Sequence, residues 1–280
     1  MFLKITDVFR QSGRSVPVFN DKHLSWNFRQ AKRMVEISRE LHFPMLAGSS
    51  APVAWRIPAI DTPFGSPQKY AVAISYSGID IYGFHVLEAL QCMVERRRGG
   101  ETGVRAVQCL QNRDCWNFID ANGWTKRLFE QALSHSNTRK PGNPRDLVKE
   151  PVVFVVDYND GLKAAAFLLT GLLEDFTVAV DVEGRSAPVS TLMNLQNNRP
   201  HHHFGCLVKN IEIMFNTGKP PYPVERTMLT SGILDFALES RLRGSRKLET
   251  PELAQVRYQT PNVSHFCATG WGPDGKRLDM

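Results

Sequence analysis

A single strand–helix–strand pattern in the first fifty residues restricts the fold more than any other feature of the sequence. Residues 16–19 and 43–47 are short apolar runs, and between them residues 28–41 repeat apolar side chains at helical spacing. A connecting helix of this length favours two parallel strands of one sheet, joined by a right-handed crossover. The amino-terminal part therefore predicts a small parallel α/β layer with one complete unit.

The remaining sequence has a different pattern. Asp160-Gly161 lies between two apolar runs and predicts a β-hairpin, because glycine supplies the positive φ of a tight turn at little cost. We expect strands over residues 69–76, 104–110, 152–158, 162–169 and 174–182, and helices over residues 81–94, 123–133, 203–216 and 225–241. The predicted class is α+β: a partial Rossmann-type parallel remnant (1–55), an α+β domain with a mainly antiparallel open sheet (56–260), and a loose tail (261–280).

Composition excludes several classes of protein. The five cysteines form no Cys-x-x-Cys pair, which favours reduced, buried thiols. No apolar run reaches the roughly 18 residues of a membrane span, and the first residues do not resemble a secretion signal, so we expect a cytoplasmic protein without a membrane partner. The net charge of +6 is spread along the chain among acidic residues, so nucleic acid is not an expected partner.

Two motifs suggest ligands that their context does not support. Gly270, Gly272 and Gly275 form a literal G-x-G-x-x-G, but no buried strand precedes it and no apolar helix follows, as a dinucleotide site requires. His201-His202-His203 contains metal-type side chains, but neighbouring residues point in different directions. We expect no metal there, and instead a helix start that lines a cleft.

Lys22 follows the first predicted strand directly, between Asp21 and His23. Ligands of open α/β sheets collect outside the carboxyl ends of the strands. A lysine at that place can bind an anionic group or donate a proton. The spacing alone does not choose between this hypothesis and a solvated loop lysine.

Residues 15–23 resemble one motif of the Gfo/Idh/MocA oxidoreductases, in which a Lys-Pro-Val strand is followed by Glu-Lys-Pro and a helix. Here Asp21 replaces the glutamate and His23 replaces the second proline. In that family the lysine lies beside nicotinamide and substrate. The resemblance therefore implies a catalytic Lys22, with Asp21 and His23 contacting the substrate.

Residues 76–88 are similar to the glycine-rich turn and the Asp-x-Gly-x-His helix start of the same family. Gly83 and His85 match in register, whereas Ile81 occupies the aspartate position. Asp80 is one residue away, which is a rotation of about 100° on a helix. The resemblance implies that His85 is catalytic and that Asp80 contacts the substrate. Arg56 is a further candidate for a substrate contact, and a salt bridge within the protein is the alternative for it.

A third match, residues 204–224, resembles the late helix and Gly-x-x-Pro connection of the family. The resemblance implies an NAD(P)-dependent oxidoreductase that acts on CH–OH groups of a sugar or polyol. The family's first four strands and glycine loop have no counterpart, so we expect a truncated protein that does not bind NAD or NADP alone. The alternative is a non-catalytic binding or dimerisation module that uses the open sheet.

The sheet itself suggests a homo-oligomer. If helices cover one face of the strands at residues 152–182, the other face needs cover as well. We therefore expect the chain to self-associate through this sheet.

Overall fold

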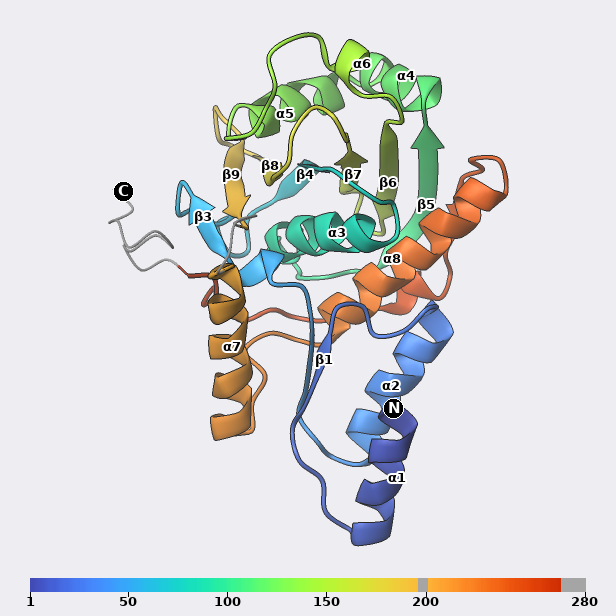
Figure 1. Cartoon of the computed structure of the whole chain (residues 1–280), viewed down its shortest axis with the longest axis vertical. Coiled ribbons are helices and arrows are strands. Elements are labelled where there is room, and N and C mark those ends of the chain that lie inside the picture. Colours follow the sequence, from blue (N-terminus) through green and yellow to red (C-terminus); the bar gives the residue numbers. More distant parts are fainter. Residues whose placement is uncertain (196–200, 268–280) are drawn as a thin grey trace.

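The structure is a computed structural model, and its described part comprises residues 1–195 and 201–267 (Figure 1). The predicted parallel unit is present. Strands β1 (Val18–Asp21) and β2 (Met45–Gly48) pair in parallel, and helix α2 (Phe28–Glu40) connects them. Asn27 caps α2, since its side chain accepts a hydrogen bond from the N–H of Gln30 at 2.9 Å.

Helices cover both faces of this two-stranded sheet, as a parallel sheet requires. Helix α7 (His203–Thr217) packs on one face, where Leu207 and Met214 share a buried cluster with Leu46 of β2. Helix α2 packs on the other face, and α1 (Phe2–Ser12) lies beside it. Helix α7 thus belongs with the parallel unit in space, although most of the chain separates them in sequence.

The larger sheet is almost entirely antiparallel. In the described residues it has eight strands in the order β10-β5-β6-β7-β4-β8-β9-β3, and only β4 and β7 pair in parallel. Gly161, with φ 92°, forms the predicted turn between β6 and β7. In chain order the strands are β3 (Trp55–Ile57), β4 (Gln68–Ser75), β5 (Val104–Gln111), β6 (Val152–Tyr158), β7 (Lys163–Leu168), β8 (Phe176–Val182), β9 (Val189–Asn194) and β10 (Leu248–Glu249).

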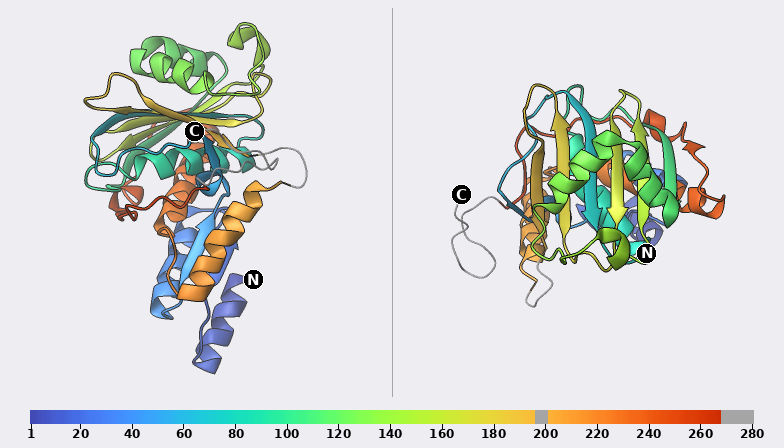
Figure 2. Two further views of the ribbon diagram at one scale, coloured as in Figure 1. Left: turned by 90° about the vertical axis from the view of Figure 1, so that its left-hand side faces the viewer. Right: turned by 90° about the horizontal axis from the view of Figure 1, so that it is seen from above.

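Helices lie on both faces of this sheet as well (Figure 2). Helices α3 (Ile81–Val94) and α8 (Glu225–Leu242) pack on the face toward the parallel unit. Helices α4 (Arg113–Ala121) and α5 (Gly123–Leu133) pack on the opposite face. The remaining short helices are α6 (Pro144–Leu147), η1 (Ala51–Val53) and η2 (Leu253–Gln255).

The second face of the sheet is therefore not bare. Leu128 and Phe129 of α5 form a buried cluster with Val72, Ile74 and Phe167 of the sheet. The premise that this face needs cover from another copy is wrong, because the chain supplies α4 and α5 as its own cover. Self-association stays a prediction without that physical reason.

Residues 261–267, the described part of the expected loose tail, make specific contacts. The N–H of Cys267 donates to the carbonyl of Val53 at 3.0 Å, and Arg96 donates to the carbonyl of Asn262 at 3.1 Å. The literal G-x-G-x-x-G at Gly270 to Gly275 lies outside the described residues. No helix in the described ranges is both long enough and apolar enough to cross a membrane.

Candidate functional site

An open cavity of about 510 Å³ lies where the carboxyl end of β1 meets the first turns of α3 and α7. Side chains from distant parts of the sequence share its wall. Among them are Lys22, Ser50, Tyr82, His85, Phe176 and Phe204. A concave site of this size, mainly aromatic with a few polar groups, is typical of small-molecule binding.

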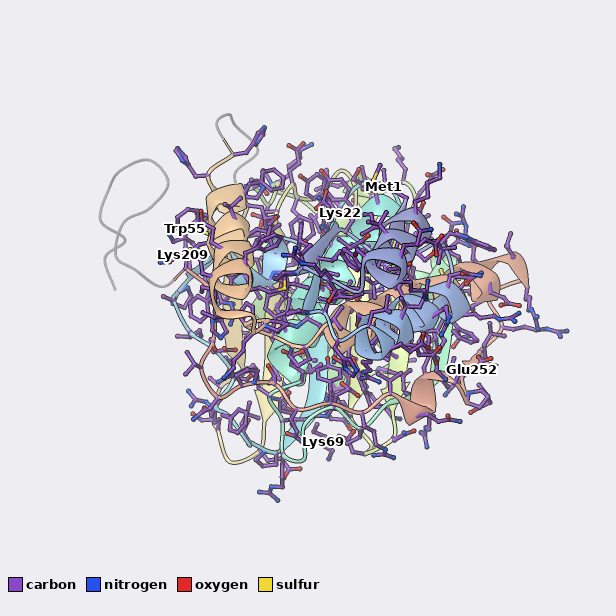
Figure 3. All side chains as sticks on the ribbon, turned by 90° about the horizontal axis from the view of Figure 1, so that it is seen from below. Met1, Lys22, Trp55, Lys69, Lys209 and Glu252 are labelled. Carbon is purple, nitrogen blue, oxygen red and sulfur yellow. The ribbon has the colours of Figure 1, made fainter. Side chains whose placement is uncertain are left out.

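Lys22 reaches the cavity from the end of β1. Its backbone is left-handed, with φ 69°, and its N–H donates to the carbonyl of Gly48 at 3.2 Å, which ties it to the end of β2. The Nζ atom donates to Asp21 Oδ1 at 2.8 Å and lies 5.6 Å from the centre of the Phe204 ring. In Figure 3, Lys22 lies between α7 and the N-terminal helices.

His85 reaches the same cavity from the second turn of α3. Its Nδ1 lies 2.6 Å from Ser49 Oγ, in the loop that follows β2. Burial, followed by the charge of Lys22, lowers the pKa of His85 to about 4. The imidazole is therefore neutral at pH 7. Thus the structure brings together the two residues for which the sequence predicted a catalytic role.

A buried carboxylate supports this corner of the cavity from behind. Glu88 Oε2 accepts from the N–H of Ser49 at 3.2 Å, and Oε1 accepts from the hydroxyl of Thr230 at 2.6 Å. Burial raises the pKa of Glu88. A Cβ on Gly48, whose φ is +122°, would lie 2.4 Å from Glu88 Oε2, so this position requires glycine. Sequence reasoning missed the role of Ser49, and the only signal was the Gly-Ser-Ser turn after a strand.

Aromatic rings beside His85 form a further part of the wall. Tyr82 stacks on Phe176 with ring centres 5.9 Å apart and an interplanar angle of 14°, and Tyr76 contacts Tyr82 at 4.8 Å. His201 and His203 also line the cavity, and burial lowers the pKa of His203 to about 4. Within residues 1–195 and 201–267, no three metal-type side chains converge on one point.

The structure places the other predicted substrate contacts outside the cavity lining. Asp80 is exposed just before α3, and Asp21 is exposed beside Lys22. The ring of His23 packs against the ring of Phe84, with ring centres 5.6 Å apart. Arg56 is buried elsewhere and pairs with Asp61 at 2.9 Å, so its charge is already balanced inside the protein.

The start of α2 does not have the features of a pyrophosphate site. A phosphate site needs free N–H groups at the start of a helix that follows a parallel strand. At the start of α2 two of these groups are used by side chains, because the N–H of Phe28 donates to Asp235 Oδ2 and that of Gln30 to Asn27 Oδ1, both at 2.9 Å. The connection from β1 to α2 also contains no glycine.

Solved oxidoreductases share this fold. GenD2 from gentamicin A biosynthesis, in complex with NAD, matches 88% of this chain and 74% of its own at 13% identity, with a TM-score of 0.55. The myo-inositol dehydrogenase of Lactobacillus casei, in complex with NAD(H) and myo-inositol, is 13% identical in sequence. The match covers 91% of this chain and 76% of the dehydrogenase, with a TM-score of 0.55. An oxidoreductase of Agrobacterium radiobacter, in complex with NAD+, L-tartaric acid and magnesium, is 14% identical in sequence. The match covers 89% of this chain and 78% of the oxidoreductase, with a TM-score of 0.53.

No family model and no curated protein sequence matches the chain. The structural neighbours are oxidoreductases of the Gfo/Idh/MocA type, so the resemblance seen in the sequence is confirmed at the level of the fold. At 13–14% identity the likeness establishes the fold alone. The chemistry of this chain has to be argued from its own cavity.

Proposed function

We propose that this chain is the substrate-binding portion of an oxidoreductase-like protein that resembles NAD(P)-dependent sugar and polyol dehydrogenases. The observation that carries the proposal is the meeting of Lys22 and His85 in one cavity on a fold shared with such enzymes. The substrate would be a small molecule rich in oxygen atoms, as are the myo-inositol and L-tartaric acid bound by two neighbours. A cytoplasmic location is part of the same proposal, supported by five free cysteines.

Lys22 supplies the positive charge of the site. Its ammonium group can hold a ligand oxygen and exchange a proton with it, since it stands at the carboxyl end of a strand and its ion pair with Asp21 is exposed and weak. His85 presents a neutral imidazole to the same oxygen. The stacked Tyr82 and Phe176 exclude water from one side of the ligand.

Cofactor binding by this chain alone is not part of the proposal. At the start of α2 the N–H groups of Phe28 and Gln30 already donate to side chains, which makes them unavailable to a phosphate. Titration calorimetry with NADH and with NADPH should therefore show no binding in the micromolar range. A micromolar affinity for either dinucleotide would contradict this part of the proposal.

Ligand binding is tested separately from cofactor binding. L-tartrate and myo-inositol are titrated into the chain, and the Lys22→Met variant is compared with Lys69→Met, which removes an exposed lysine far from the cavity. We expect Lys22→Met to weaken L-tartrate binding by about tenfold or more, as loss of one charge-assisted hydrogen bond predicts. Equal affinities of the two variants would refute the role of Lys22.

A non-catalytic binding module is the second candidate. The same start of α2 favours it, because a chain that cannot hold the dinucleotide can still bind a small ligand in the cavity. Turnover of a bound polyol in the presence of NAD or NADP would exclude this candidate.

A further inference from the structure

The contacts of Ser49 determine which nitrogen of His85 carries the proton. Ser49 is fully buried, and its Oγ makes two hydrogen bonds within the described residues. It accepts from the N–H of Ala51 at 3.0 Å and lies 2.6 Å from His85 Nδ1. The first contact uses a lone pair of the hydroxyl oxygen, so the hydroxyl hydrogen is still available.

That hydrogen has one acceptor among the described residues, which is His85 Nδ1. If Nδ1 carried the proton instead, the serine would have to accept from it as well, and its own hydrogen would be buried without a partner. A buried donor without a partner is costly. The arrangement in which Ser49 donates to Nδ1 satisfies both groups.

The backbone of Ser49 is fixed independently of the imidazole. Its N–H donates to Glu88 Oε2 at 3.2 Å, and Glu88 is held in turn by Thr230. A serine held in this way cannot rotate with the ring, so its hydroxyl selects one tautomer. This contact is between segments 36 residues apart in sequence.

We infer that Ser49 is a positioning residue that holds His85 as the Nε2–H tautomer, so that His85 is a hydrogen-bond donor to the ligand and not its base. The part of this inference that concerns the ligand rests on the proposed function, whereas the part that concerns the tautomer does not. A neutral imidazole that already carries a proton on Nε2 has no lone pair there to receive another. Proton exchange with the ligand then belongs to Lys22, while His85 polarises the same oxygen.

Nitrogen NMR measures the tautomer directly in the free protein. The chain is labelled with ¹⁵N-histidine, and the His85 signal is assigned by its loss in His85→Gln. We expect an unprotonated nitrogen at Nδ1 and a protonated one at Nε2 near pH 7. The opposite tautomer in the wild-type chain would overturn the inference, and this measurement requires no variant to fold apart from the assignment.

The role of Ser49 is tested with a matched pair of neighbouring serines. Ser49→Ala should mix the two tautomers or invert them, because the donor to Nδ1 is gone. Ser50 also lines the cavity, but in the described residues the serine hydrogen-bonded to His85 Nδ1 is Ser49, so Ser50→Ala should leave the tautomer unchanged. An unaltered tautomer in a folded Ser49→Ala chain would overturn the inference.

Ligand binding by two variants of His85 tests whether this residue acts as a hydrogen-bond donor or as a base. Glutamine keeps an N–H donor at position 85 but cannot act as an imidazole base, whereas phenylalanine keeps only bulk. We expect His85→Gln to bind L-tartrate within about threefold of wild type, and His85→Phe to lose about tenfold. Equal losses in both variants would contradict the donor role. If the wild-type chain does not bind L-tartrate, the proposed function loses support, while the tautomer measurement still decides the inference about Ser49.

Discussion

The parallel unit and the eight-stranded domain both bury the two faces of a sheet under helices, but the covering helices come from different parts of the chain. The domain covers both faces of its sheet with helices from its own stretch of sequence. The parallel unit has two strands, and one of its faces is covered by α7, which follows the strands β3 to β9 of the domain in the chain. A short parallel sheet has little apolar surface of its own, so its stability depends on neighbours.

The contacts between the two regions show this dependence. The N–H of Leu24 donates to Ser231 Oγ at 3.2 Å, and the N–H of Phe28 donates to Asp235, both on α8. The candidate site lies at the junction of the two regions, with Lys22 from one and His85 from the other. The cavity is therefore built from both regions, since the domain provides His85 and the parallel unit adds Lys22.

The largest effect is expected from the ion pair beneath this junction. Glu95 accepts hydrogen bonds from Arg226 Nε and from the hydroxyl of Tyr258, both at 2.9 Å. The charged side chains of Glu95 and Arg226 are both buried. Glu95→Gln leaves Arg226 buried without its counter-charge, which should cost about 3–5 kcal/mol of unfolding free energy. Urea denaturation measures it. The exposed pair of Arg33 and Glu40 is the control, and Glu40→Gln should leave the urea midpoint nearly unchanged.

The second prediction concerns the parallel unit alone. Phe43 is buried and contacts Phe9 of α1 at 5.3 Å. Phe43→Ala should cost about 3 kcal/mol and should raise amide hydrogen exchange in residues 1–48 more than in β6 and β7. A uniform rise of amide hydrogen exchange over the whole chain would show that the two regions unfold as one. The parallel unit would then not be less stable by itself than the domain.

The third prediction uses the pH dependence of stability. The folded pKa of His85, about 4, is below its ordinary value of 6.5, so between these values the folded state binds fewer protons than the unfolded state. Its contribution to stability is present above pH 6.5 and is lost as the pH falls toward 4, by at most about 3 kcal/mol. Denaturation at pH 7 and pH 4.5 should show a smaller loss in His85→Gln than in wild type.

The smallest effects come from two helical glycines. A Cβ on Gly83 would lie 2.9 Å from the Phe154 ring, so Gly83→Ala should destabilise the domain by about 1–3 kcal/mol. Gly205 of α7 has open space around it, so Gly205→Ala should stabilise the chain by about 0.5–1 kcal/mol. Thermal unfolding of both variants measures the difference. Equal shifts in the same direction would contradict the packing described for α3.

Sequence periodicity predicted much of the fold because buried faces repeat. The ranges expected for α5 and β6 match the structure, and those for β1 and β2 are correct to within two residues. Strand β3 was missed because three residues show no periodicity, and β10 because it has only two. Strand β9 is a single short run, which carries a weak signal of its own.

The site was less predictable than the fold. Lys22 was a candidate because it follows a strand, but its catalytic role and that of His85 were predicted through resemblance to a family, and no local pattern places the two residues in one cavity. Ser49 and Glu88 act through contacts between distant segments, such as Glu88 with Thr230, 142 residues away. Arg56 was assigned to the substrate because a sequence does not show that Asp61 neutralises it inside the protein.

The end of β2 is fastened to the domain at several points. The carbonyl of Ala47 accepts from Thr227 at 3.0 Å and from Tyr222 at 3.4 Å, and Gly48 rests on Glu88 without space for a methyl group. At these described residues the joint holds the end of β2, and with it the backbone of Lys22, against the domain. If the cavity binds a ligand as proposed, the ligand meets Lys22 at a place that was set during folding, so little binding free energy is lost to rearranging this joint.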